Sequence, residues 1–255
     1  MSSQSDLARL RLADFVERFR GQMIPLSGKF AYFPASLPLT GEDIDEYLQE
    51  PIAALPPAMV AELPPVNLLL APHLERNGGK GQKAGDAYIT AERPAESKAV
   101  FSAELMRGGE SFLAFAIQEQ EVADYHYRFY HGLAKLISQR WNGESQMAYS
   151  KLLREELCAG VHGEVDEQSW HLKQGLVRRQ VNLRRETKGF QEYAVSSFID
   201  TLTLYLHGIC CDIDVETGPR QLPSRYLRRR LDLLYGLYPP PAGYAVFPED
   251  LSPPK

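Results

Sequence analysis

A continuous amphipathic segment from Gln118 to Trp141 constrains the fold of this chain more than any other feature. Apolar residues recur there at spacings of three and four, which is typical of an α-helix with one buried face. The stripe consists of Val122, Tyr125, Phe129, Leu133, Leu136 and Ile137. The pattern predicts a helix over 119–141. Glu119 and His126 point toward the stripe, so burial would require a polar partner for each.

The chain after this segment predicts a series of further helices. Glycine-containing breaks separate stretches of helical periodicity, such as Asn142-Gly143 and Gly218-Pro219. The helices are expected over 145–158, 164–180, 188–210 and 223–236. The C-terminal half is therefore predicted to be mainly helical.

The chain before this segment predicts strands. Short apolar runs bounded by turn residues are expected to form strands over 66–71, 87–91, 99–106 and 111–117. Gly108-Gly109 suits a two-residue turn that requires positive φ, so the last two runs predict a hairpin. Periodicity leaves open that Ser111 to Ile117 already belongs to the long helix. Strands followed by helices indicate an α+β fold: a small antiparallel sheet, about residues 66–117, packed against helices.

Prolines divide the chain into a central body with two arms. Residues 1–65 predict a helical and Pro-rich wrapping segment, with a short helix over 7–20, irregular chain over 23–39 and a capping box at Thr40. One helical turn is expected around 58–62. Residues 66–238 form the predicted α+β core, and 239–255 an extended Pro-rich tail. The glycine-rich stretch 76–86 lacks a phosphate-binding pattern and predicts a surface loop.

Composition favours a folded protein of the cytoplasm. The net charge of −5 gives no overall field for nucleic acid or anionic lipid, and no secretory signal or membrane span is apparent. The three cysteines, Cys158, Cys210 and Cys211, are too few and too irregular for a disulfide framework. Cys210 and Cys211 end an apolar helix, which predicts small buried side chains.

Carboxylates and histidines on two predicted helices suggest a divalent metal ion as the one candidate cofactor. Imidazole and carboxylate groups are usual ligands of zinc and similar ions. The candidate ligands are Glu119, His126, His162, Glu164, Glu167 and His171. Glu167 and His171 share a helix face, with Glu164 nearly in line. The alternative is a core histidine and an ordinary polar face, because the spacing matches no established metal motif.

A polar face on the predicted helix 188–210 offers a second arrangement with catalytic residue types. Asp200, Thr203 and His207 share this face, which resembles part of a hydrolase triad. Hydrolase nucleophiles normally sit on strained turns, however, and not within a helix. A solvent-facing surface or a helix–helix contact is therefore the favoured interpretation.

Arginines gather in two places and suggest anion or partner binding. The residues are Arg178, Arg179, Arg184, Arg185, Arg225, Arg228, Arg229 and Arg230. Planar guanidinium groups suit phosphate and carboxylate recognition. In an acidic protein, ion pairs to acidic helices or docking of an acidic partner are favoured over nucleic acid.

The sequence as a whole predicts a non-catalytic interaction or assembly protein, with a protein partner or a second copy of the chain. A metal-dependent hydrolase with Glu and His ligands from two core helices is the first alternative. Binding of nucleic acid or phosphate through the arginines is the second. No motif identifies a substrate or a reaction.

Overall fold

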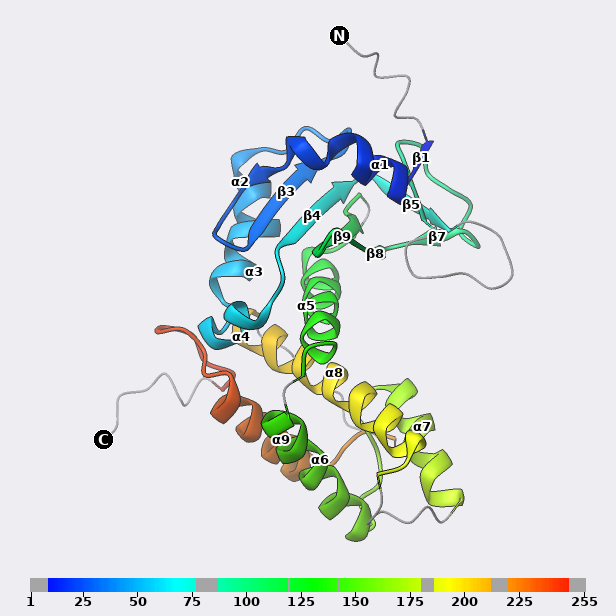
Figure 1. Cartoon of the computed structure of the whole chain (residues 1–255), viewed down its shortest axis with the longest axis vertical. Coiled ribbons are helices and arrows are strands. Elements are labelled where there is room, and N and C mark those ends of the chain that lie inside the picture. The colour runs from blue at the N-terminus through cyan, green and yellow to red at the C-terminus, as the bar shows by residue number, and fades with distance from the viewer. Residues whose placement is uncertain are drawn as a thin grey trace. The chain divides into compact units, whose positions relative to one another are not determined.

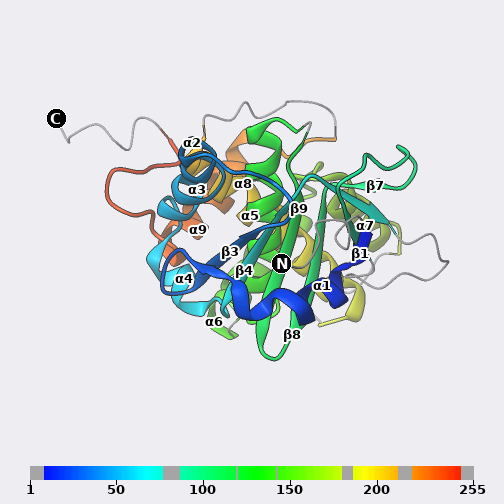
Figure 2. The same ribbon diagram turned by 90° about the horizontal axis from the view of Figure 1, so that it is seen from above.

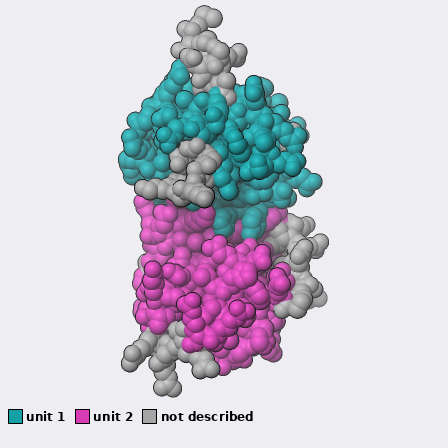
Figure 3. All heavy atoms as spheres, turned by 90° about the vertical axis from the view of Figure 1, so that its right-hand side faces the viewer, with its two compact units in different colours: residues 1–52, 63–132 teal, residues 53–62, 133–255 magenta. Residues whose placement is uncertain are grey.

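We describe the protein in a computed structural model, for residues 9–76, 87–118, 120–141, 143–179, 186–211 and 220–247. Two compact units divide the chain, and Figure 3 colours them separately. Unit 1 contains residues 1–52 and 63–132, and unit 2 contains residues 53–62 and 133–255. The helix α5 (Val122–Ser138) starts in unit 1 and ends in unit 2. No helix in the described ranges is both long and apolar enough to span a bilayer.

Unit 1 is built on a five-stranded sheet with the order β2-β3-β4-β9-β8 (Figures 1 and 2). The strands are β2 (Ile24–Pro25), β3 (Phe30–Pro34), β4 (Val66–Ala71), β9 (Glu110–Ala116) and β8 (Ser102–Arg107). The three central strands are parallel, with Tyr32 opposite Leu68 and Leu68 opposite Leu113. The two edge strands are antiparallel to their neighbours.

Both faces of this sheet are covered, and successive side chains of each strand point to opposite faces. On one face, Leu69 and Phe112 pack in a core with Leu12 and Phe15 of α1 (Leu12–Phe19). On the other face, Phe115 meets the first turns of α5, where its ring centroid lies 5.2 Å from that of Tyr125. The strand β4, apolar except for Asn67, lies at the centre and is buried along its whole length.

A second, antiparallel sheet completes unit 1. Its order is β1-β6-β5-β7, from β1 (Arg9–Arg11), β6 (Ala87–Thr90), β5 (His73–Arg76) and β7 (Ala99–Val100). Two short helices, α2 (Gly41–Ile44) and α3 (Glu50–Ala53), flank the π-helical turn η3 (Asp45–Gln49), and the 3-10 turn η2 (Arg20–Gln22) follows α1. Thr40 and Asp43 form the expected capping box, since each side chain binds the other's backbone N–H.

Unit 2 is helical and centres on the long helix α8 (Lys188–Cys210). The other helices are α4 (Pro57–Glu62), α6 (Gly143–Cys158), α7 (Glu167–Arg178) and α9 (Ser224–Leu237). Aromatic rings pack α6 and the chain before it against α8. The ring of Phe198 on α8 stacks on Trp141, with 4.2 Å between ring centroids, and lies 5.4 Å from the ring of Tyr149 on α6. α8 is buried on several sides, and its buried positions include polar residues such as Thr201 and Thr203.

The α+β class and the helical C-terminal half are confirmed. The hairpin is also confirmed, with Gly108 and Gly109 both at positive φ, and Ser111 to Ala116 lies in a strand and not in the long helix. Three findings were not predicted. Residues 23–39, expected to be irregular, contribute β2 and β3, and the central strands are parallel. α7 begins only at Glu167, after its cap Asp166.

Some predictions fall beyond what the structure tests. The glycine-rich loop lies mostly outside the described residues, as do Glu119, Arg184 and Arg185. The predicted domain boundaries after residues 65 and 238 stay predictions.

Candidate functional site

A pocket of about 280 Å³ lies in unit 1 at the sheet edge where parallel strands end. β4 ends at Ala71 and β9 ends at Ala116, and the two strands run in the same direction. The residues that follow them therefore meet at one edge: His73 and Leu74 after β4, and Gln118 after β9. Loops that follow parallel strands converge in this way, and such edges commonly bind ligands.

Backbone hydrogen bonds hold the pocket residues of this edge in place. The Gln118 N–H donates to the carbonyl of Pro72 at 3.3 Å, which ties the chain after β9 to the chain after β4. The Ala116 N–H donates to the carbonyl of Phe101 at 3.0 Å. Because β8 runs antiparallel to β9, Phe101 enters β8 at this same edge and lines the pocket. One side of the pocket is therefore fixed by the pairing of the strands.

The loop between β6 and β7 closes the pocket from another side. The Thr90 hydroxyl and the Glu92 backbone bind one another at 3.1 Å, which starts a turn at the end of β6. At the other end of the loop, the Lys98 N–H donates to the Ala95 carbonyl at 2.8 Å, and the Lys98 carbonyl accepts from the Arg76 N–H at 2.7 Å. These anchors fix the two ends of the loop that carries the charged pocket residues.

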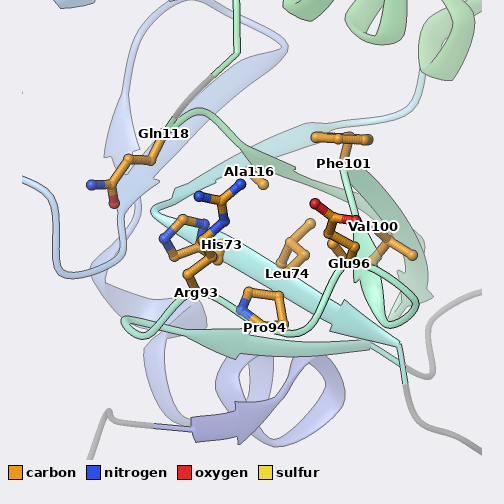
Figure 4. Close-up of a pocket in the computed structure, with 10 residues that line it drawn as sticks. His73, Leu74, Arg93, Pro94, Glu96, Val100, Phe101, Ala116 and Gln118 are labelled. Atoms are coloured by element: carbon orange, nitrogen blue, oxygen red, sulfur yellow. The ribbon is translucent and has the colours of Figure 1, made fainter.

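Groups of opposite charge line the pocket on either side of an apolar centre. In the view of Figure 4, Arg93, His73 and Gln118 lie toward one side, Glu96 lies toward the other, and Leu74 lies between them. The remaining lining residues are apolar: Pro94, Ala99, Val100, Phe101 and Ala116. Among these, Phe101 is the large apolar side chain with substantial exposure, at 44%. The guanidinium of Arg128 lies 4.5 Å from its ring centroid.

This arrangement suits a small ligand that carries both charges. A guanidinium offers N–H donors to a carboxylate or phosphate, and a carboxylate accepts from an ammonium or amide donor. The volume is near the lower limit of ligand pockets, which range from roughly 300 to 1,000 Å³.

A second polar centre is buried within unit 2. The guanidinium of Arg230 on α9 contacts Glu156 of α6 and Glu164, and all three side chains are fully buried. Nη1 and Nη2 of Arg230 lie 2.7 and 2.8 Å from the two Glu164 oxygens. Nη2 also lies 2.6 Å from Oε2 of Glu156, and Nε binds the same carboxylate. Nη1 donates in addition to the Ser197 hydroxyl at 2.8 Å, so all five N–H groups can be satisfied.

Lys173 balances the charge of this cluster. Its ammonium lies 3.3 Å from Oε1 of Glu164 and donates to the Gly163 carbonyl at 2.7 Å. The Tyr193 hydroxyl donates to the same Glu164 oxygen. Burial by itself raises the pKa of Glu164, but the charges and hydrogen bonds of Arg230, with Lys173 and Tyr193, outweigh burial and lower it to about 2. The two carboxylates and two cations thus form a neutral, ionised structural centre.

Asp200 on α8 is a further buried carboxyl group of unit 2. Its residue is 7% exposed, and within the described residues its Oδ2 has no hydrogen-bond partner. Burial raises the pKa of Asp200 to about 7, against a lowering effect of the Ser169 hydroxyl, and the charge of Asp166 raises it further. The sequence had suggested a solvent-facing surface or a helix contact for this face, and the burial of Asp200 and Thr203 excludes the first.

The predicted metal ligands fall into separate environments. His126 lies in unit 1, buried, with Nε2 2.9 Å from the Glu46 carbonyl. Glu167 and His171 form an exposed i,i+4 pair at 3.5 Å, and His162 is exposed. The prediction that Glu164 shares a helix face with Glu167 and His171 is wrong. Glu164 precedes α7 and pairs with Gln221 in a β-bridge, and its carboxylate binds Arg230.

The predicted anion-binding arginines also differ in their environments. Arg230 is buried in its ion cluster, which corrects its assignment to a surface site for anions or partners. Its neighbours pair with acidic side chains, as the sequence favoured: Arg229 with Glu155, and Arg228 with Asp232 at 3.0 Å. Arg178, Arg179 and Arg225 are exposed.

Sequence reasoning did not single out the pocket residues. Arg93 and Glu96 stand in a loop with no motif, and only the position of His73 directly after a strand and a proline gave a local signal. Comparison with known proteins adds no relative: the chain has no significant match to a family model, to a curated protein or to a solved structure.

Proposed function

We propose that this protein acts by binding, without catalysing a reaction, and that the pocket of unit 1 holds a small zwitterionic ligand of the size of an amino acid. The observation that carries the proposal is the placement of Arg93 and Glu96 around the apolar Leu74. A ligand with a carboxylate and an ammonium group satisfies both charges at once.

The lining of the pocket supports binding over catalysis. Among the described residues that line it there is one carboxylate, Glu96, and there is no Ser, Thr, Cys or Lys. Paired carboxylates or an activated nucleophile, which many hydrolytic mechanisms require, are therefore not provided by these residues. Arg93 and His73 instead supply donors that suit recognition of an anionic group.

Isothermal titration calorimetry with the free α-amino acids tests the proposal. We expect at least one of them to bind, and we expect its N-acetyl and its amide derivatives to bind more weakly, because each lacks one charge. Arg93→Gln and Glu96→Gln should each weaken binding by about tenfold or more, the usual effect of losing one hydrogen bond to a charged group.

Two variants in the same loop serve as matched controls. Lys98→Gln and Glu92→Gln remove one cation and one carboxylate outside the pocket lining, so affinity should stay within about twofold of the unchanged protein, as for surface charges generally. The proposal fails if no amino acid binds at millimolar concentration. It also fails if the pocket variants and the loop controls change affinity equally.

The other functional predictions from the sequence remain predictions. They are a protein partner or a second copy of the chain, a location in the cytoplasm, and binding of nucleic acid or phosphate through the arginines. A metal-dependent hydrolase is the remaining one, with candidate ligands Glu119, His126, His162, Glu164, Glu167 and His171. None of these predictions depends on the pocket.

A further inference from the structure

The two adjacent cysteines at the end of α8 bring their sulfur atoms together. Sγ of Cys210 and Sγ of Cys211 lie within 4.8 Å of one another. α8 ends at Cys210, and at Cys211 the backbone becomes extended, with φ −131° and ψ 146°. The Cys211 N–H still donates to the His207 carbonyl at 2.8 Å, so the last helical turn fixes this change of direction. The backbone change at the end of α8 therefore brings the two sulfur atoms close together.

Both thiols are partly accessible. Cys210 and Cys211 are half-buried, in contrast to the small buried side chains that the apolar sequence predicted. Neither is part of a disulfide. A side chain that is only half-buried can be reached by a small ion from solvent, whereas a fully buried thiol normally is inert.

The sulfur separation matches simultaneous contact with one metal ion. A metal–thiolate bond measures about 2.3 Å, so two sulfurs on opposite sides of one ion are about 4.6 Å apart and closer when the angle is smaller. The limit of 4.8 Å therefore places both thiolates within reach of a single ion after little or no movement. Thiolates are soft ligands that favour ions such as Cu(I), and Cu(I) accepts a small number of ligands.

We propose that Cys210 and Cys211 form a binding site for a soft metal ion of low coordination number, Cu(I) being the representative. Both cysteines belong to unit 2. Binding releases the thiol protons, because each sulfur binds as the thiolate. The affinity therefore rises with pH until both thiols are ionised.

The test is an anaerobic titration of the reduced protein with Cu(I), in competition with a chromophoric Cu(I) chelator. The unchanged protein should withdraw about one Cu(I) per chain from the chelator, since two thiolates hold one ion. Cys210→Ser and Cys211→Ser should each lower the affinity by about a hundredfold or more, because each removes half of the soft donors. Cys158→Ser is the matched control, because this exposed cysteine lies elsewhere, at the end of α6.

A second measurement separates loss of binding from loss of folding. Cu(I) should raise the melting temperature of the unchanged protein and of Cys158→Ser, but not that of the two pair variants, since a ligand stabilises only the state that binds it. Circular dichroism of the metal-free variants should match that of the unchanged protein. The inference is overturned if the chelator retains all Cu(I). It is also overturned if Cys210→Ser and Cys211→Ser, folded by this criterion, compete as well as the control.

Discussion

Arg230 and Glu164 form a completely buried ion pair, with Nη1 2.7 Å from Oε2, although the residues lie 66 positions apart in the chain. The same guanidinium binds Glu156, 74 positions away. Taking these charges out of water costs several kcal/mol for each ion, and only the full set of hydrogen bonds offsets this cost. The pair therefore makes unit 2 sensitive to the loss of any one member.

Removal of the central cation should destabilise the protein strongly. Arg230→Met keeps much of the side-chain volume but leaves Glu156 and Glu164 buried without their shared partner. We expect the free energy of unfolding to fall by about 3–5 kcal/mol, as measured for other broken buried pairs. Urea unfolding followed by circular dichroism gives this value.

Arg229→Met is the control for that experiment, because the neighbouring Arg229 makes an exposed pair with Glu155. Exposed pairs contribute about 0–1 kcal/mol. Equal losses in Arg230→Met and Arg229→Met would contradict a structural role for the buried cluster.

Asp200 should make stability depend on pH between about pH 4 and pH 7. Its pKa is raised from 3.8 to about 7 in the folded protein, so its contribution is fully present below pH 3.8 and is lost as pH rises through 7. Asp200→Asn keeps the shape without the titration. We expect the variant to be more stable than the unchanged protein at pH 8, by up to about 1.4 kcal/mol for each unit of the pKa shift.

The comparison of unfolding free energies at pH 5 and pH 8 checks this expectation. The advantage of Asp200→Asn should shrink at pH 5, where the folded protein holds Asp200 protonated. Asp232→Asn removes an exposed carboxylate and is the control for the general effect of losing one negative charge. An advantage that does not change between the two pH values would mean that Asp200 does not titrate in this range.

Gly163 should tolerate no side chain. Its φ is +79°, and a Cβ atom would lie 2.0 Å from the Gln221 carbonyl oxygen, at the bridge that positions Glu164. Gly163→Ala must therefore separate the two segments and disturb the Arg230 cluster. Gly160→Ala is the matched control. Its φ is also positive, at +66°, but a Cβ atom at this position would meet nothing within 4 Å.

Thermal and urea unfolding of both variants measure the difference. Gly160→Ala should cost about 1–2 kcal/mol, the penalty of left-handed backbone for a residue with a Cβ. Gly163→Ala should cost clearly more. Similar losses would show that the contact between Gly163 and Gln221 relaxes without consequence.

Local signals explain what the sequence predicted correctly. The apolar spacing through Tyr125 and Phe129 predicted α5, and Gly108-Gly109 predicted the hairpin, because each depends on neighbours along the chain. β2 and β3 were missed because Pro25 and Pro34 suggested interruption. Both prolines instead stand at the ends of strands, where a missing N–H is tolerated.

The polar sites depend on distant partners and gave no comparable signal. Arg230 stands among three other arginines on an amphipathic helix, and nothing nearby in sequence distinguishes it as the buried one. Glu164 was assigned to the helix face of Glu167 because the break at Asp166 was not recognised. Arg93 and Glu96 meet His73 only through the pairing of β5, β6 and β7.

The cluster around Arg230 also sets an order of events during synthesis. Glu156, Glu164 and Ser197 leave the ribosome well before Arg230, so for a time the nascent chain contains both carboxylates and lacks the guanidinium that neutralises them. Burying them at that stage would leave charges without partners. Unit 2 therefore completes its core only after α9 has emerged, and a chain interrupted before residue 230 would remain open to proteases and chaperones.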